Sequence, residues 1–592
     1  MQFPSISRRA FLLTLVLVAS VIRIIYLVEI LSGPCAVTHR NTETDMDFFY
    51  HGAEVISGGD WLVDQELHPY KDWNRVISDK LLPEDPGPEG LHAMDAGETA
   101  EAAGIALWNR WYGGKTYHQE PLYTYFLAVI FALAGPELWL VFAIQSLCGV
   151  ICILLVYDIS RRLFSEATAR VAAVLALFYG PMLFYEAVLL RAAFICLTSL
   201  LLVWLMILAR KEDRSWLWLA LGGSCGTAIL LKSMFLLYPA GLAVYYVIKT
   251  PPRSWKTRAN AIAWGMLGFT VALIPLVTRN LIVGAPPLST NGVTPITLLV
   301  PNIPGNSVTE YDPLGGNTPE LIAKADGDLV STIGQILAIN SPLGLIEKAA
   351  EKAEAIFHWF EYPNNTSFYL YKLYSQVLDL MPISTRIILA LALAGLFLSF
   401  KRMDNNAPLL IMICLHFAVM LLAWVSSRLR VPLVVCSIPL AALALVWITE
   451  NLKSRRFKGP GLAFILILTF FWYMGREIPA SMTPVRPVDS LTTWLYFYLP
   501  ELEDAGLRNS KEKELALWNR FYSTQPERIT EMILDPVPRN EKEQKLAEIY
   551  SRAGAKYANE LFQQGDIDSG SQFWAESQML QQAASSGGDL RP

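Results

Sequence analysis

The chain has 592 residues, of which 53% are hydrophobic and 17% are charged, and its formal net charge is −5. A typical globular domain carries about 25% charged residues. This composition excludes a disordered chain and a disulfide-rich secreted chain, and it indicates an integral membrane protein. The negative charge, with no basic run, argues against nucleic acid as a partner. The seven cysteines show no paired CxxC spacing, so the sequence predicts neither a disulfide framework nor a zinc site.

Eleven apolar runs have the length of a membrane-spanning helix, or slightly less. The first begins like a signal peptide, but it is too long for a cleaved apolar region and Arg23 interrupts it, so we expect an uncleaved first span. The eleven runs lie at about 11–32, 137–157, 171–189, 192–209, 216–231, 233–248, 260–277, 387–400, 407–425, 431–448 and 461–475.

A shorter apolar run at 121–135 could be a further span or an interfacial helix. Loop charge distinguishes the two. If the N-terminus is cytoplasmic and 121–135 does not cross, every basic cluster between spans falls on the cytoplasmic side, as the positive-inside rule requires. We therefore expect 121–135 to lie in the outer interface, with an amphipathic or re-entrant role. The clusters are Arg161, Arg162 and Arg170; Arg210, Lys211 and Arg214; Lys249, Arg253, Lys256 and Arg258; Lys401 and Arg402; and Lys453, Arg455, Arg456 and Lys458.

This topology predicts a transmembrane domain at 1–475 with two long outer loops, at about 33–136 and 280–386. The tail, 476–592, loses the apolar character and is predicted to be extracytoplasmic. Its stretches at 541–564 and 569–583 show helical spacing of apolar residues around a turn, which predicts an antiparallel helix pair. The pair is weakly similar to one tetratricopeptide unit and suggests a protein partner.

The first outer loop carries two acids, Asp45 and Asp47, soon after the first span. A carboxylate beside an apolar wall suits a general base, because partial desolvation raises its pKa toward the working pH. On spacing alone, solvated loop acids near a helix start are the favoured interpretation, because acids are common in outer loops.

Five basic residues sit at the outer ends of spans, where the positive-inside rule would not place them. Each could simply extend its charge to the interface. Together they predict a binding site for a lipid phosphate, with Arg279 and Arg430 as the preferred donors. Glu186, near Arg191, could be a structural ion pair or an acceptor contact. The five are Arg191, Lys232, Arg279, Arg428 and Arg430.

Several blocks, in this order, resemble the GT-C superfamily of glycosyltransferases. More narrowly, they resemble the bacterial branch related to protein O-mannosyltransferases and the lipid A aminoarabinose transferase, which is glycosyltransferase family 39-like. The resemblance covers roughly residues 5–450. The blocks are DMDFFYHGAEVISGGDW, HQEPLYTYFLAVIFALAG, DISRRLFSEATARVAAVLALFYGPMLFYEAVLLRAAF, TRNLIVGAPPLSTNGVTP and SSRLRVPLVVCSIPLAALAL.

The resemblance implies an all-α GT-C bundle of about 11 transmembrane helices in a bacterial inner membrane. It also implies an undecaprenyl- or similar polyprenyl-phosphate sugar donor, used on the periplasmic side, with an acid of the first outer loop as the base. The family register selects Asp45, eight residues before Ala53, with Asp47 as the second acid of a DxD. In the family, the short run at 121–135 is a juxtamembrane helix.

The resemblance also suggests secondary roles for residues near this helix. Glu120 stands where some relatives place another loop acid, and His118 lies beside it, although HQEPLY departs from the family pattern. Lys232, followed by Ser, stands where relatives often show Arg followed by Pro.

Two other functions stay open: a polytopic transporter, which should show internal repeats, and a noncatalytic scaffold that uses the tail. For an enzyme, the sugar, the polyprenol, a divalent cation and the choice between Asp45 and Asp47 as base also stay open. So do the acceptor (a protein, a lipid or a glycan) and the oligomeric state.

Overall fold

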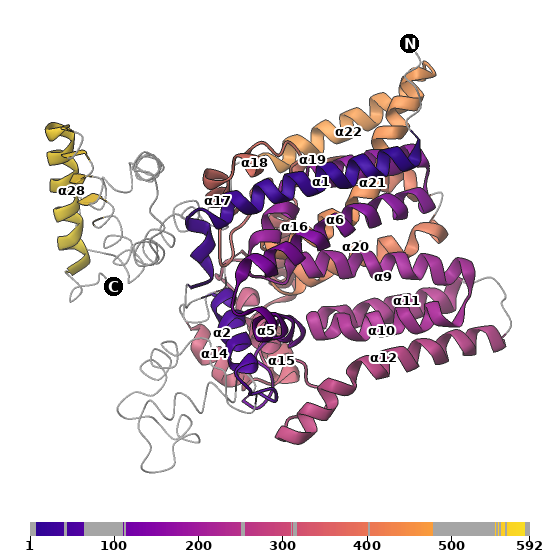
Figure 1. Ribbon diagram of the computed structural model, residues 1–592, viewed down its shortest axis with the longest axis horizontal. Helices are drawn as coiled ribbons and strands as arrows, with labels where there is room; N and C mark the ends of the chain where they lie inside the picture. Colours follow the sequence, from indigo (N-terminus) through magenta and orange to yellow (C-terminus); the bar gives the residue numbers. More distant parts are fainter. Residues whose placement is uncertain are drawn as a thin grey trace. The chain divides into compact units, whose positions relative to one another are not determined.

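A computed structural model of the chain shows the arrangement of its helices (Figure 1). Regular secondary structure in the described residues is helical, alongside isolated β-bridges that pair Tyr179 with Ile383 and Asn364 with Thr366. The predicted all-α class is therefore confirmed for this part of the chain. The described residues are 7–40, 44–63, 111, 114–249, 255–309, 311, 317–400, 403–476, 551, 554–555, 558–559, 561–562 and 565–585.

The chain divides into two compact units. One comprises Met1–Glu29 and Thr42–Thr483, and the other comprises Ile30–Asn41 and Pro484–Pro592. The larger unit holds nearly all of the apolar helical residues that the structure describes, and the predicted site residues all fall within it.

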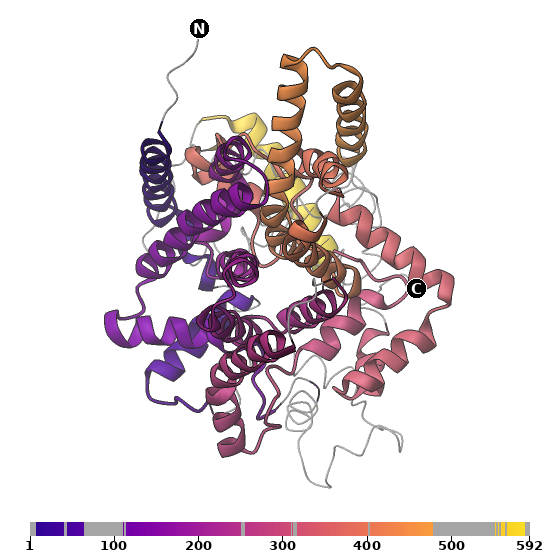
Figure 2. The same cartoon turned by 90° about the vertical axis from the view of Figure 1, so that its right-hand side faces the viewer.

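Six of the described helices are long and apolar enough to cross a membrane, and a bent helix pair could raise the number to seven. A helix rises about 1.5 Å per residue, so about 20 residues cross the hydrocarbon layer. The chain is an integral, multi-pass membrane protein. In Figure 2, which looks at the bundle from the end opposite α2 and α5, α1 lies at its edge. The six are α1 (Arg8–Leu31), α6 (Leu138–Leu163), α9 (Ala192–Glu212), α12 (Trp255–Val283), α20 (Met403–Leu422) and α21 (Ser427–Lys453).

The other five predicted spans fall on shorter helices, so the count of eleven stays a prediction. One of them needs correction: the run 171–189 is not one helix, because α7 ends at Leu177. The short α8 (Gly180–Phe184) follows, and Pro181 in its first turn cannot continue the preceding hydrogen-bond ladder. The five helices are α7 (Glu166–Leu177), α10 (Ser215–Leu231), α11 (Leu237–Lys249), α19 (Thr385–Ser399) and α22 (Lys458–Met474).

Glycines let the helices of the bundle approach closely. A Cβ placed on Gly222 of α10 would lie 1.8 Å from the carbonyl oxygen of Gly265 on α12, and one on Gly395 of α19 would lie 1.9 Å from that of Leu440 on α21. In lipid, the hydrophobic effect does not drive helices together, so helix association depends on close packing. Small residues at the crossings allow the two backbones to come into contact. These contacts fix the helices whose ends carry Lys232 and Arg428.

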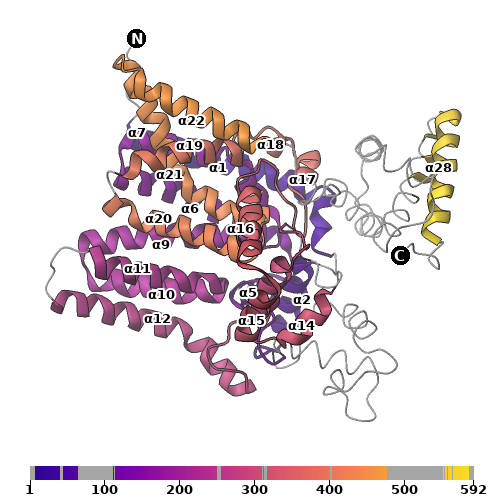
Figure 3. The ribbon, with the colours of Figure 1, turned by 180° about the vertical axis from the view of Figure 1, so that it is seen from behind.

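Shorter helices gather at one end of the long ones, as α2, α5, α14 and α15 show in Figures 1 and 3. The helix α5, at 13 residues, is about 20 Å long and too short to cross alone. The pair α15 and α16 is bent by 104°. These helices are α2 (Asp45–Ser57), α5 (Leu122–Ala134), α13 (Thr294–Leu299), α14 (Thr318–Ala325), α15 (Leu329–Ile339), α16 (Pro342–Ile356), α17 (Phe368–Tyr374) and α18 (Gln376–Asp379).

In the tail, α28 (Ile567–Ser585) covers the second of the two predicted helical stretches. Most of the first stretch, 541–564, lies outside the described residues, so the antiparallel pair stays a prediction. Most of the first outer loop, 64–110, also lies outside them.

Candidate functional site

Asp45 is the first residue of α2 and the meeting point of three distant segments. Thr44 caps the helix by accepting a hydrogen bond from the Asp47 amide. Asp45 Oδ1 accepts from Gln119 Nε2 at 2.6 Å. Its Oδ2 accepts from Asn365 Nδ2 at 3.0 Å and from the Arg428 guanidinium, with which it forms an ion pair. Segments of the two predicted outer loops and the first turn of α21 therefore hold one carboxylate.

The surroundings of Asp45 keep it ionised. Burial alone would raise the pKa of Asp45, but the charge and hydrogen bond of Arg428 outweigh burial, aided by Asn365 and the charge of Arg191. The pKa of this carboxyl group is therefore held below its usual value. While Arg428 is bound, Asp45 is a weak base.

The Asp47 side chain lies in a different environment from that of Asp45. Residues two apart on a helix do not share a face. Its Oδ1 lies 3.1 Å from Nε2 of His51, one turn further along α2. Burial raises the pKa of Asp47, and the His51 charge opposes that rise. The two acids of the predicted DxD do not converge.

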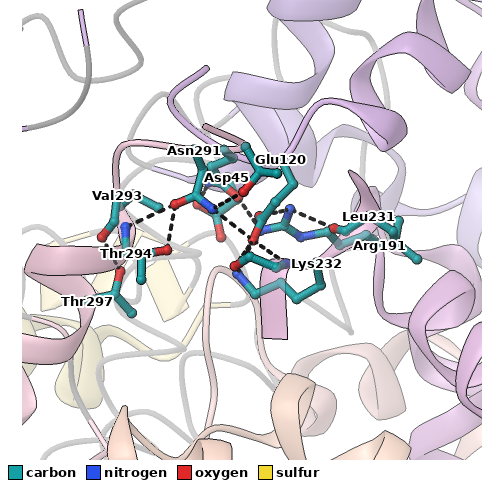
Figure 4. A network of polar contacts seen from close by, with 12 residues as sticks. Asp45, Glu120, Arg191, Leu231, Lys232, Asn291, Val293, Thr294 and Thr297 are labelled. Atoms are coloured by element: carbon teal, nitrogen blue, oxygen red, sulfur yellow. Dashed lines mark hydrogen bonds and ion pairs between the residues drawn. The ribbon is translucent and has the colours of Figure 1, made fainter. Parts of the chain in front are cut away.

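Glu120 is fully buried just before α5 and neutralises two of the predicted cations (Figure 4). Its Oε2 lies 2.6 Å from Arg191 Nη1, and its Oε1 lies 3.5 Å from Lys232 Nζ. Oε1 also accepts from the Ser233 amide and hydroxyl, both at 2.8 Å, and from Asn291 Nδ2 at 3.2 Å. Burial would raise the pKa of Glu120, but Lys232, Arg191 and Ser233 hold it below its usual range.

Gln119 joins the two carboxylates into one connected group. Its Oε1 accepts from Arg191 Nη2 at 2.7 Å, while its Nε2 donates to Asp45. We call this group the outer polar network. It contains three cations and two carboxylates, an excess of one positive charge. It comprises Asp45, Gln119, Glu120, Arg191, Lys232 and Arg428.

The cations of the network differ in exposure. Lys232 exposes 23% of its side chain and Arg428 exposes 12%, against 5% for Arg191. Lys232 and Arg428 are therefore the cations that an incoming anion reaches most easily.

The two arginines preferred from the sequence are bound to backbone. Arg279 donates to the carbonyl oxygens of Leu62, Val63 and Lys115 at 2.6–2.8 Å. Arg430 is fully buried and donates to the carbonyls of His358 and Phe360, and to Glu361 Oε2 at 2.7 Å. Arg279 and Arg430 therefore connect loops to helices. The geometry favours Arg428 and Lys232 over these two arginines as the residues that donate hydrogen bonds to a phosphate.

Glu186 and His118 make contacts that stabilise the fold. Glu186 pairs with Arg23 of α1 at 2.7 Å, rather than with the nearby Arg191, and both side chains of the pair are buried. His118 packs edge-on to Phe48, and burial lowers the pKa of His118 to about 4. A neutral imidazole offers no charge to a phosphate.

Sequence reasoning missed the uncharged members of the site. Gln119 stood within HQEPLY between two residues that were singled out. Asn365 adopts a left-handed φ of 66°, which Asn tolerates better than most residues. Asn365, Ser233 and Asn291 carry no charge, so the sequence alone does not identify them as members of the site. Among the described residues, no group of three His, Cys, Asp or Glu side chains is arranged to hold a metal ion.

Residues 118–279 match the family model for dolichyl-phosphate-mannose-protein mannosyltransferases. The match confirms the predicted family resemblance over these residues. The matched segment contains Gln119, Glu120, Arg191 and Lys232. A search of curated proteins finds no match.

Solved structures show distant likeness. The apo oligosaccharyltransferase of Archaeoglobus fulgidus is 15% identical, with 67% of this chain and 53% of that chain covered and a TM-score of 0.35. ArnT of Cupriavidus metallidurans, bound to undecaprenyl phosphate, is 13% identical, with 79% and 66% covered and a TM-score of 0.32. The chain spans about half the length of the archaeal enzyme.

Proposed function

We propose that this chain is a GT-C-type glycosyltransferase that moves a sugar from a polyprenyl-phosphate donor to an acceptor hydroxyl. The observation that carries the proposal is the outer polar network, where a partly buried carboxylate, Asp45, adjoins an excess of positive charge. The family match over 118–279 supports the donor class, because its description names a dolichyl-phosphate sugar.

The network suits the charges that the reaction moves. The acceptor oxygen bonds to the anomeric carbon, and the bond from that carbon to the phosphate oxygen breaks. The electron pair of the broken bond leaves with the polyprenyl phosphate, and the acceptor proton passes to Asp45. Lys232 and Arg428 would stabilise the departing phosphate, since cationic N–H donors placed where negative charge develops lower the barrier.

The separation of roles sets the stereochemistry. A base on the face opposite the leaving phosphate gives inversion, by the geometry that separates inverting from retaining glycosidases. Loop charge supports a periplasmic site in a bacterial inner membrane. The tail, 476–592, would serve a protein partner in addition to catalysis.

The test is sugar transfer by purified full-length protein from synthetic undecaprenyl-phosphate sugars to envelope extract. Loss of a general base costs about 100- to 10,000-fold, so Asp45→Asn should nearly abolish transfer. Asp47→Asn should cost less, because its side chain faces His51. NMR of the product should show an inverted anomeric configuration. Near-normal transfer by both variants and by the double variant would refute the Asp base, and retention would refute single displacement.

A further inference from the structure

The ion pair between Asp45 and Arg428 occupies two groups that the proposed reaction needs separately. A general base works best with a pKa near the operating pH, yet Arg428 holds the pKa of Asp45 below its usual value. A phosphate-binding arginine needs free N–H groups, yet Asp45 accepts from Arg428. The structure therefore describes a resting arrangement of the proposed site.

We infer that the Asp45–Arg428 ion pair is a latch that the donor phosphate opens: phosphate oxygens replace the Asp45 carboxylate on Arg428, and the released carboxylate becomes the base. The inference rests on the proposed function and adds regulation of the same site. It couples base activation to lipid-phosphate binding, so the base is withheld until a polyprenyl phosphate is bound.

The exchange preserves charge balance at Arg428. A sugar-linked polyprenyl phosphate is a diester with one negative charge, which offsets the single excess positive charge of the network. Arginine pairs with phosphate through two parallel hydrogen bonds as readily as with carboxylate. Removing one partner of a buried pair without replacement is costly because it leaves a bare charge. Substitution by phosphate avoids that cost for Arg428.

Asp45 also keeps its place after release. Gln119 and Asn365 donate to its two oxygens at 2.6 and 3.0 Å, and neither depends on Arg428. These amides are positioning residues that hold the carboxylate without adding positive charge. Once the arginine is withdrawn, burial dominates and raises the pKa of Asp45 toward the working range.

The other charges near Asp45 limit this rise without cancelling it. Arg191 and Lys232 face the carboxylate as cations, but Glu120 lies against both of them. His118 interacts with Asp45 and is neutral. Arg428 is the cation in direct contact, so its removal has the largest effect.

The sharpest test measures binding rather than turnover. Undecaprenyl phosphate, without sugar, is titrated into purified full-length protein in nanodiscs. If carboxylate and phosphate compete for Arg428, Asp45→Asn should tighten binding by about tenfold, as expected for loss of a charged hydrogen bond. Glu54→Gln removes an exposed negative charge from the same helix, and its affinity should stay at the wild-type value.

A double-mutant cycle separates competition from a general charge effect. Arg428→Gln should weaken binding, and Asp45→Asn should have no further effect in that background. The latch is refuted if Asp45→Asn alone leaves lipid binding unchanged or weaker. It is also refuted if Asp45→Asn tightens binding equally in the wild-type and Arg428→Gln backgrounds. If those results accompany normal wild-type sugar transfer, the latch fails and the proposed function stands. If wild-type protein neither binds the lipid nor transfers sugar, both fail.

Discussion

Arg23 on α1 lies 2.7 Å from Glu186, and both side chains are buried. Glu186 also fills the space that a side chain at Gly149 would need, since a Cβ there would fall 1.9 Å from its Oε1. The arginine that interrupts the first apolar run is thus a partner in a buried ion pair that ties α1 to the segment after α8.

Breaking that pair should destabilise the protein without touching the proposed site. Arg23→Met leaves the Glu186 charge buried and alone, a change that typically costs about 3–5 kcal/mol. Thermal unfolding in detergent should show a clear drop in Tm. The double variant Arg23→Met with Glu186→Leu should recover much of the loss, because no bare charge remains. A single variant as stable as wild type would show that the pair is not a structural tie.

Phosphate binding should weaken at alkaline pH because of Lys232. Burial and the neighbouring Arg191 lower the pKa of Lys232 to about 8, against the opposing pull of Glu120. The ammonium is charged below that pH and neutral above it, so its attraction for phosphate is present below about pH 8 and lost above it. Titrations with undecaprenyl phosphate between pH 6.5 and 9.5, a range of roughly 1.5 units either side, should show the fall.

Lys232→Arg is the matched variant, because arginine stays protonated throughout this range. Its affinity should be nearly independent of pH. The same alkaline fall in both proteins would assign the titration to another group.

Gly222 of α10 should not tolerate a methyl group. A Cβ there would lie 1.8 Å from a backbone oxygen of Gly265, so Gly222→Ala should cost about 1–3 kcal/mol through overpacking. Gly223→Ala, one residue along, is the control, because its Cβ would lie 3.7 Å from the carbonyl oxygen of Gly268, an ordinary contact. Tm values from thermal unfolding compare the two. Equal stability would mean that α10 and α12 separate easily.

The topology predicted from loop charge can be tested by cysteine labelling. Ser585→Cys, in the tail helix α28, should react with an impermeant reagent in intact spheroplasts. Ser454→Cys, in a loop predicted to be cytoplasmic, should react only after lysis. Labelling of Ser585→Cys only after lysis would place the tail on the other side and contradict the eleven-span topology. A variant of Cys414, the exposed native cysteine, is the background for both.

The helices were largely predictable because apolar length needs no knowledge of neighbours. The six long spans all coincide with predicted runs. The prediction of one helix over 171–189 was wrong because it rested on apolar composition alone. Gly180 and Pro181 lie within this run and interrupt the helix. Length counts alone also cannot tell whether helices such as α19 cross.

The members of the site were partly predictable, but their partners were not. Charge at the predicted outer ends of spans identified Arg428, and the family register selected Asp45. The two residues lie 383 positions apart and pair directly. The same signal ranked Arg279 and Arg430 first. A sequence does not show that both arginines donate their hydrogen bonds to backbone carbonyl oxygens. Gln119 carries no charge and so gave no signal of its own.

The three partners of Asp45 come from positions 119, 365 and 428, so the site is finished late in synthesis. A nascent chain that has inserted α1 and completed α2 carries the carboxylate long before the ribosome reaches α21. Until then, the carboxylate lacks the arginine that donates to it, and the surrounding loops lack one of their fixed points. A chain truncated before Arg428 would contain the whole family-matched segment, 118–279, and still lack a complete site.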